Sequence, residues 1–113
     1  MSLLEINKKK PKNEVYLDSK YLNNIGFCYL QLNQYQDSLN YYLKSLELLQ
    51  KQKEESKDLI FEKNQALLYL YINYQLLDDK QKAEQYMQDD PSFQKQAESK
   101  LLFFQKKNRN NDY

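Results

Sequence analysis

Residues 19–50 read SKYLNNIGFCYLQLNQYQDSLNYYLKSLELLQ, and this stretch decides the fold. It contains the only glycine of the chain, Gly26, and the small residues Ser38 and Ser45, which alternate with bulky side chains. Apolar residues recur at helical spacing on both sides of Asn33, which tolerates the left-handed conformation that ends many helices. The stretch therefore predicts two antiparallel helices whose backbones approach closely at the small side chains.

Composition favours an all-α protein of one small domain. The chain has 113 residues with one glycine and two prolines, which leaves little turn chemistry for a β-sheet. Its 17 basic and 16 acidic residues give a net charge of +1, and Arg109 is the only arginine. This balance argues against a dedicated nucleic-acid or membrane-surface protein, for which a basic patch rich in arginine is typical.

Residues that serve most catalytic and metal sites are scarce. Histidine is absent, so the commonest general base and metal ligand is missing, and one glycine cannot make a glycine-rich phosphate loop. Cys28 is the only cysteine, and we expect it to be a small buried hydrophobe rather than a reactive thiol. We therefore expect no enzyme activity, no cofactor and no metal.

The sequence has neither the pattern of a membrane-spanning helix nor that of a signal peptide. No apolar run approaches the roughly 18 residues that a membrane-spanning helix requires. The first ten residues place their lysines after a short apolar patch, which reverses the order of a signal peptide. A single cysteine fits a reducing compartment. We therefore expect an intracellular, cytoplasmic protein without a membrane span.

Helix signals divide the chain into an arm, a helical domain and a tail. Residues 1–18 are interpreted as an N-terminal arm, because Pro11 and the lysines around it interrupt the helical pattern. The helical domain is predicted over residues 19–107, and a polar C-terminal tail over residues 108–113. Within the domain the expected helices run from Asp18 or Ser19 to Leu32, from Gln34 or Tyr35 to beyond Leu49, from Ser56 to Leu77, from Lys80 to Gln88 and from Pro91 to Lys107.

The spacing of large and small residues in the first helical pair resembles a tetratricopeptide repeat (TPR). In this repeat a large residue is followed by Leu-Gly and then by Tyr in the first helix. A small, an aromatic and a second small residue follow in the second helix. Gln50 departs from the closing proline of that pattern, so the polar run after Leu49 is expected either to lengthen the second helix or to form a polar connection. The matching positions are, in order, Leu22, Ile25, Gly26, Tyr29, Ser38, Tyr42 and Ser45. The apolar stripe expected to face the core of the first helix is Leu22, Ile25, Tyr29 and Leu32.

A second match lies further along the chain, where Tyr74 and Ala83 repeat Tyr29 and Ser38 at a separation of 45 positions in each case. This period is similar to that of the long-helix TPR variant of kinesin light chains. The helix from Pro91 resembles the capping helix that closes such arrays. The resemblance implies an all-α, TPR-like α-hairpin solenoid of two helical pairs plus a C-terminal capping helix.

The resemblance also implies a binding groove, formed by the face of each first helix that does not pack within its pair. Its residues would be Lys20, Asn23, Asn24, Phe27, Leu30 and Gln31 from the first pair, and Gln65, Leu68, Tyr69, Ile72 and Leu76 from the second. Asn24 matches the family position whose asparagine often binds a peptide backbone. The charged clamp for a carboxyl terminus is not reproduced, because Phe27, Leu68 and Tyr69 carry no charge. The groove would be apolar and open to a partner, unless the capping helix folds onto it.

The expected function is a non-catalytic protein-protein interaction module, a small adaptor or structural subunit of a larger intracellular complex. The partners would be protein subunits, with a homodimer through the groove left open, and family members serve in cytoskeletal and ciliary assemblies among others. The alternative is a nucleic-acid-associated helical protein that uses its lysine-rich ends, Lys8–Lys10 with Lys12 and Lys106-Lys107 with Arg109. The paired acids Asp78-Asp79 and Asp89-Asp90 are expected to cap helices rather than to bind a metal.

Overall fold

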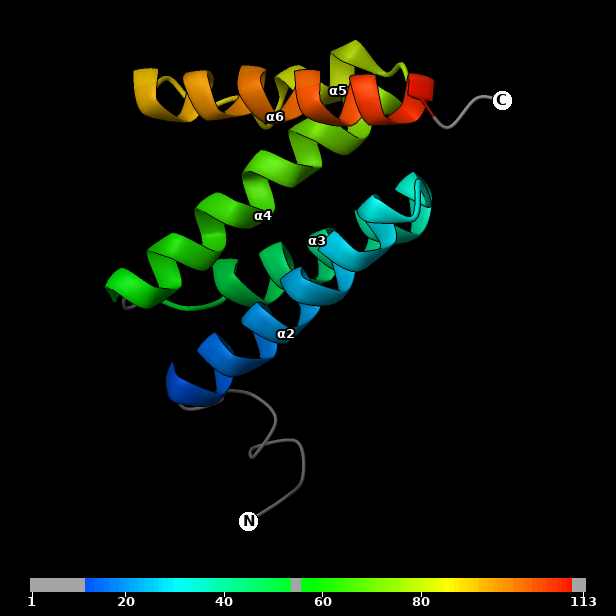
Figure 1. Cartoon of the computed structure of the whole chain (residues 1–113). Coiled ribbons are helices and arrows are strands. Elements are labelled where there is room, and N and C mark those ends of the chain that lie inside the picture. Colours follow the sequence, from blue (N-terminus) through cyan, green and yellow to red (C-terminus); the bar gives the residue numbers. More distant parts are fainter. Residues whose placement is uncertain (1–11, 54–55, 111–113) are drawn as a thin grey trace.

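A computed structural model describes residues 12–53 and 56–110 of the chain, and these residues are folded into helices without any strand (Figure 1). The expected all-helical class is thus confirmed for the described part of the chain. The helices are α2 (Lys12–Gln31), α3 (Tyr35–Gln50), α4 (Lys57–Leu76), α5 (Lys80–Glu84) and α6 (Pro91–Asn110).

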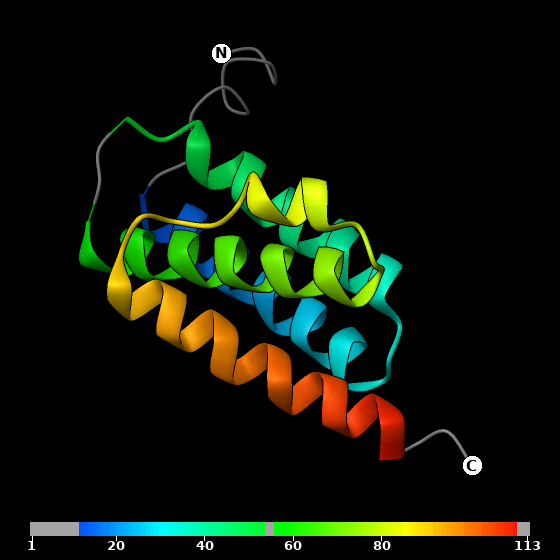
Figure 2. The ribbon, with the colours of Figure 1, turned by 90° about the horizontal axis from the view of Figure 1, so that it is seen from above.

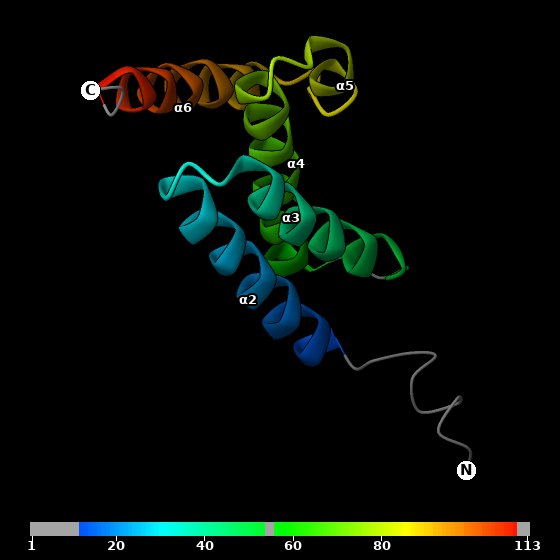
Figure 3. The same ribbon diagram turned by 90° about the vertical axis from the view of Figure 1, so that its right-hand side faces the viewer.

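Helices α2 and α3 form an antiparallel hairpin, and they lie side by side in each view (Figures 1 and 3). The turn depends on Asn33, which has a φ of 62°, as its expected left-handed conformation requires. The next residue closes the helix end, because the N–H of Gln34 donates to the carbonyl oxygen of Tyr29 at 2.9 Å. The predicted reversal near Asn33 is therefore confirmed.

Small side chains set the spacing between α2 and α3. The Ser38 hydroxyl donates to the carbonyl oxygen of Gly26 at 2.6 Å, and the Ser45 hydroxyl donates to that of Ser19 at 3.3 Å. A Cβ atom placed on Gly26 would lie 2.7 Å from the Cε2 atom of Tyr42, closer than any normal contact. The predicted close approach at Gly26, Ser38 and Ser45 is confirmed, and the Tyr42 ring fills the space that glycine leaves.

Helix α2 begins earlier than the sequence suggested. It starts at Lys12, so the interpretation of residues 12–18 as an arm is wrong, whereas residues 1–11 lie outside the described part of the chain. Val15 is fully buried and packs with Leu49 and Leu59, which gives these first turns a place in the core. A proline just ahead of a helix does not interrupt it, because the first-turn N–H groups have no intrahelical partner.

The buried face of α2 also differs from the expected stripe. Its buried residues are Val15, Ser19, Asn23, Gly26 and Leu30. The expected stripe is only half-buried at Leu22, Ile25 and Tyr29, and it is exposed at Leu32. Part of the reason is steric, because Ser19 and Gly26 face α3, where small residues allow the two helices to pack closely. Ser19 thus lies inside α2 rather than at its start, and its hydroxyl donates to the carbonyl oxygen of Tyr16 at 2.9 Å.

Helices α4 and α5 repeat several contacts of the first hairpin 45 positions later. Asp78 has a φ of 60°, like Asn33, and the N–H of Asp79 donates to the carbonyl oxygen of Tyr74 at 2.8 Å. Stacked rings recur at the same separation: Tyr29 with Tyr41 at 5.5 Å, and Tyr74 with Tyr86 at 5.6 Å between centroids. The described chain therefore contains two hairpins of related construction.

The second hairpin is shorter than expected. Helix α5 ends at Glu84 rather than at Gln88, and turns lead from there to Pro91 at the start of α6. Helix α6 extends to Asn110, so the expected tail from residue 108 is helical over its first three positions. Helix ends commonly differ from prediction by such amounts, since the terminal turns lack a full set of hydrogen bonds.

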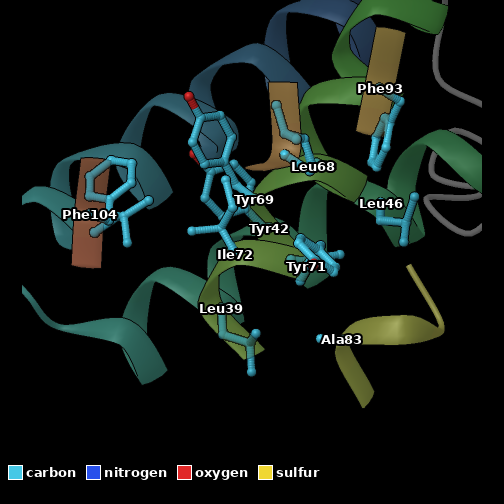
Figure 4. Packing of buried hydrophobic residues seen from close by; sticks show 14 residues of the cluster. Leu39, Tyr42, Leu46, Leu68, Tyr69, Tyr71, Ile72, Ala83, Phe93 and Phe104 are labelled. Atoms are coloured by element: carbon cyan, nitrogen blue, oxygen red, sulfur yellow. The ribbon is translucent and has the colours of Figure 1, made fainter. Parts of the chain in front are cut away.

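Helix α4 is the centre of the fold and packs on every other described helix (Figures 1 and 2). Six consecutive residues, 68–73, are buried, as expected for a helix that is surrounded on all sides. Their side chains join those of α3 and α6 in one cluster, where Tyr42, Tyr69 and Ile72 lie close together (Figure 4). The buried side chain of Asn73 connects α4 to α3 within this core. Its Nδ2 donates to Ser38 Oγ at 2.9 Å and to the Tyr69 carbonyl oxygen at 3.0 Å.

No helix in the described part of the chain is both long enough and apolar enough to cross a membrane.

Candidate functional site

A cavity of about 270 Å³ lies between α2 and α4. Six of the eleven groove residues predicted from the sequence line it, namely Lys20, Asn23, Asn24, Phe27, Gln65 and Tyr69. The fold thus brings the two groups of predicted residues together on one concave surface. We call this space the α2–α4 cavity.

Sequence reasoning missed three residues that also line this cavity, namely Tyr42, Phe61 and Glu62. Phe61 is a large apolar residue of its helix, yet 58% of its surface is exposed. Glu62 precedes Gln65 by three positions and Tyr69 by seven, so helical spacing could have placed it on the groove face.

The part of the predicted groove nearer to α6 is closed. Leu30, Leu68 and Ile72 are buried in the core, so the expectation that they face a partner is wrong. Helix α6 covers this region with Phe93, Ala97 and Phe104, which belong to the same cluster (Figure 4). The alternative in which the capping helix folds onto the groove therefore describes this half of the surface.

Contacts between α2 and α6 define the boundary of the closed half. The rings of Phe27 and Phe104 meet edge to face with centroids 6.3 Å apart. Lys107 Nζ donates to the carbonyl oxygen of Gln31, whose side chain is exposed. Leu76, the last of the predicted groove residues, is half-buried against the core cluster. The open half is therefore the α2–α4 cavity, on the far side of Phe27.

A buried amide and a buried carboxylate form the polar wall of the cavity. Asn23 Nδ2 donates to the Glu62 carbonyl oxygen at 3.1 Å and to Glu62 Oε1 at 3.0 Å. Asn23 Oδ1 is buried and has no hydrogen-bond partner. Glu62 itself is 4% exposed. These bonds tie α2 to α4 and leave acceptor groups in an enclosed position.

Aromatic rings form the rest of the wall. Tyr42 and Tyr69 are stacked with centroids 5.3 Å apart, and Phe27 meets Tyr69 edge to face at 5.5 Å. Burial raises the pKa of the Tyr42 hydroxyl, and the neighbouring Tyr69 adds to this shift. The Tyr42 ring therefore stays neutral at physiological pH. Lys20, at the rim, places its Nζ over the ring of Tyr16, 5.8 Å from the centroid.

A second, smaller cavity of about 170 Å³ lies between α4 and the start of α6. It shares Phe61 and Gln65 with the α2–α4 cavity, so Phe61 stands between the two. Asp90 lies on its wall and caps α6, because Asp90 Oδ1 accepts from the N–H of Ser92 at 3.2 Å. The two cavities therefore lie next to each other along α4.

Asp79 and Asp90 lie at the starts of helices, and Cys28 lies at the surface. Asp79 accepts from the N–H of Lys82 at 3.2 Å, so the capping interpretation is confirmed for Asp79 and for Asp90. Within residues 12–53 and 56–110, no group of three or more acids and cysteines could hold a metal ion. Cys28 is exposed, so its expected burial is wrong. It lies two positions from both Gly26 and Leu30, and therefore on the opposite side of α2 from these buried residues.

Comparison of this chain with protein-family models, with curated proteins and with solved structures finds no match in any of the three.

Proposed function

We propose that this protein is a non-catalytic, TPR-like protein-protein interaction module, an adaptor or structural subunit of a larger intracellular complex. It would bind a segment of a partner protein in the α2–α4 cavity and along the neighbouring surface of α4. The observation that carries this proposal is that six residues predicted from two distant stretches of sequence line one cavity.

The chemistry of the surface supports a protein partner. Phe61 is a large apolar side chain that remains exposed between two cavities, and exposed aromatic residues are enriched at interfaces. Amides from Asn24 and Gln65 line the same surface and offer hydrogen bonds to a peptide backbone. The repetition of turn and ring contacts at 45 positions supports the TPR-like interpretation of the two hairpins.

The test is a native pull-down of the tagged full-length chain, with partners identified by mass spectrometry. A Phe61→Glu variant should lose a specific set of proteins. Phe103→Glu is the matched control, because Phe103 is 61% exposed and lies on α6 away from the α2–α4 cavity. Thermal melting followed by circular dichroism would verify that both variants fold. Equal capture by the native chain and by the Phe61→Glu variant would contradict the proposal.

The nucleic-acid alternative makes a different prediction in the same experiment. Binding through lysine clusters would fall steeply with salt and would carry RNA into the captured fraction. Lys107 already contacts the carbonyl oxygen of Gln31, so part of the C-terminal cluster serves the fold. Loss of all partners at moderate salt or after nuclease treatment would favour the alternative.

A further inference from the structure

The α2–α4 cavity holds an acidic group whose charge is unmatched within the described chain. The Glu62 side chain is 4% exposed, and it accepts one side-chain hydrogen bond, from Asn23 Nδ2 at 3.0 Å. Over residues 12–53 and 56–110, no cation lies within 4.0 Å of its carboxylate. Buried charges in proteins are normally paired, because removing an isolated charge from water is energetically costly. A cationic group entering this cavity would provide the missing partner.

The side-chain amide of Asn23, next to Glu62, also has a hydrogen-bond acceptor without a partner. Asn23 Nδ2 is bound to two acceptors, both on Glu62, so the amide cannot be turned over without losing both bonds. Its Oδ1 therefore remains an acceptor, and this atom is buried without a partner. An unsatisfied buried acceptor is destabilising, and a ligand that donates a hydrogen bond to it would remove this cost. Glu62 and Asn23 thus both favour a guest that donates hydrogen bonds.

The aromatic wall suits the same guest. Phe61 is 58% exposed and, among the described residues, has no ring partner, so its face is available. Aromatic faces attract Lys and Arg side chains and also pack against their methylene stems. Tyr69 already attracts a cation of this chain, since Lys100 Nζ lies 5.8 Å from its ring centroid.

Lys20 and Lys100 place positive charges near the cavity: Lys20 lies at its rim, and Lys100 lies over the ring of Tyr69. Lys20 lines the cavity, but its Nζ is placed over the ring of Tyr16, one turn toward the N-terminus of α2. The side chain is exposed, so its ammonium group is hydrated and screened. It therefore leaves the Glu62 carboxylate without a neutralising partner.

We propose that the α2–α4 cavity receives a basic side chain, arginine or lysine, from the bound partner segment; this inference rests on the function proposed above. The cationic head donates to the Glu62 carboxylate, and local adjustment brings it to Asn23 Oδ1. The methylene stem lies along Phe27 and Phe61. Arginine suits the site better, because its planar guanidinium carries several donors in a fixed arrangement and stacks on aromatic rings.

The test is an NMR titration of the full-length chain with small probes at millimolar concentration. The probes are the N-acetyl methylamides of arginine, lysine and citrulline, of which citrulline is close in shape to arginine but uncharged. The arginine probe should shift the side-chain signals of Asn23 and the ring signals of Phe61, and the citrulline probe should bind about tenfold more weakly. The lysine probe identifies which of the two basic side chains the cavity prefers.

Two variants locate the charge that is responsible. Glu62→Gln keeps an oxygen that accepts from Asn23 but removes the charge, so it should abolish the preference for arginine over citrulline. Glu98→Gln, which removes an exposed carboxylate on α6, should leave that preference unchanged. Glu62→Gln should also raise the midpoint of thermal unfolding, since it removes an unpaired buried charge. The unfolding measurement provides a second readout that does not depend on the probes.

The inference is overturned if the arginine and citrulline probes bind equally well or neither binds, or if Glu62→Gln leaves the preference intact. Its failure is distinguishable from failure of the proposed function. Partner capture that depends on Phe61, without any preference for arginine, would leave the interaction module standing and remove only the basic side chain. Binding of the arginine probe without any partner sensitive to Phe61 would remove the interaction module.

Discussion

Gly26 shows how one residue sets the distance between two helices. Glycine inside a helix costs about 1 kcal/mol relative to alanine. The Cβ atom of an alanine at this position would lie 2.7 Å from Tyr42, a ring that is itself held between α2 and Tyr69. Overpacking of this kind costs about 1–3 kcal/mol, so the steric effect outweighs the helix propensity.

We predict that Gly26→Ala lowers the free energy of unfolding by up to about 2 kcal/mol, the difference between these two effects. Urea unfolding followed by circular dichroism provides the measurement. Cys28→Ala is the control, because Cys28 is exposed on the opposite side of the same helix and should change stability little. A more stable Gly26→Ala protein would show that the Tyr42 ring can move aside.

Tyr42 also makes the protein sensitive to alkaline pH. Burial raises its pKa above the ordinary value of 10.0, so the native state keeps the phenolic proton at a pH where the unfolded chain loses it. The stabilisation is therefore complete below pH 10 and is lost progressively as the pH rises above that value. Burial also raises the pKa values of Tyr71 and Tyr86, which adds to the effect.

We expect the free energy of unfolding to fall between neutral pH and about one unit above pH 10, and to fall less in a Tyr42→Phe variant. Urea unfolding at the two pH values measures the difference. An identical loss of stability in both proteins would mean that other groups, such as the lysines, account for the alkaline sensitivity.

At the scale of elements, α2 has two more turns than its sequence pattern indicated. Val15 anchors these turns against Leu49 and Leu59. Val15→Ala should therefore cost about 1–3 kcal/mol of unfolding free energy, as expected when methyl groups are removed from a buried site. Leu17→Ala is the control, since Leu17 is exposed on the same turns. Equal effects of the two substitutions would place residues 12–18 outside the cooperative fold.

Helix α6 covers the core through a narrow apolar face. Ala97 is fully buried between Phe93 and Phe104 on this face, and there is no room for a longer side chain. Ala97→Glu should expose the amides of α6 to hydrogen exchange while α2 and α3 remain protected, because among the described helices the backbone of α6 packs on α4 and not on α2 or α3. Ser99→Glu, at an exposed position, is the matched control. Unchanged exchange in the Ala97→Glu variant would contradict this arrangement.

At the scale of the whole molecule, α4 makes the described helices one packing unit. Every other described helix contacts it, and the main cluster of buried side chains draws on α2, α3, α4, α5 and α6. We therefore expect urea unfolding of the native chain to be a single transition, with the same midpoint by circular dichroism and by tyrosine fluorescence. Two separate midpoints would show that the hairpins unfold independently.

Much of the fold could be predicted from local sequence. Asn33 marks the turn because few other residues adopt a left-handed conformation readily, and Asp79 and Asp90 begin helices because their carboxylates accept from first-turn N–H groups. The small residues at 26, 38 and 45 indicated where helices approach. The start of α2 and the identity of its buried face were not predictable in this way, because both depend on residues of α3 and α4.

The candidate site, like the fold, could be predicted from the sequence only in part. The resemblance to a tetratricopeptide repeat implied that Lys20, Asn23, Asn24 and Phe27 share one helix face, and that Gln65 and Tyr69 share another. Only the tertiary structure decided that these faces meet in a cavity, that Glu62 and Phe61 complete it, and that α6 buries Leu68 and Ile72. The physical reason is that periodicity reports which side chains share a face of a helix, whereas exposure depends on which distant helix packs against that face.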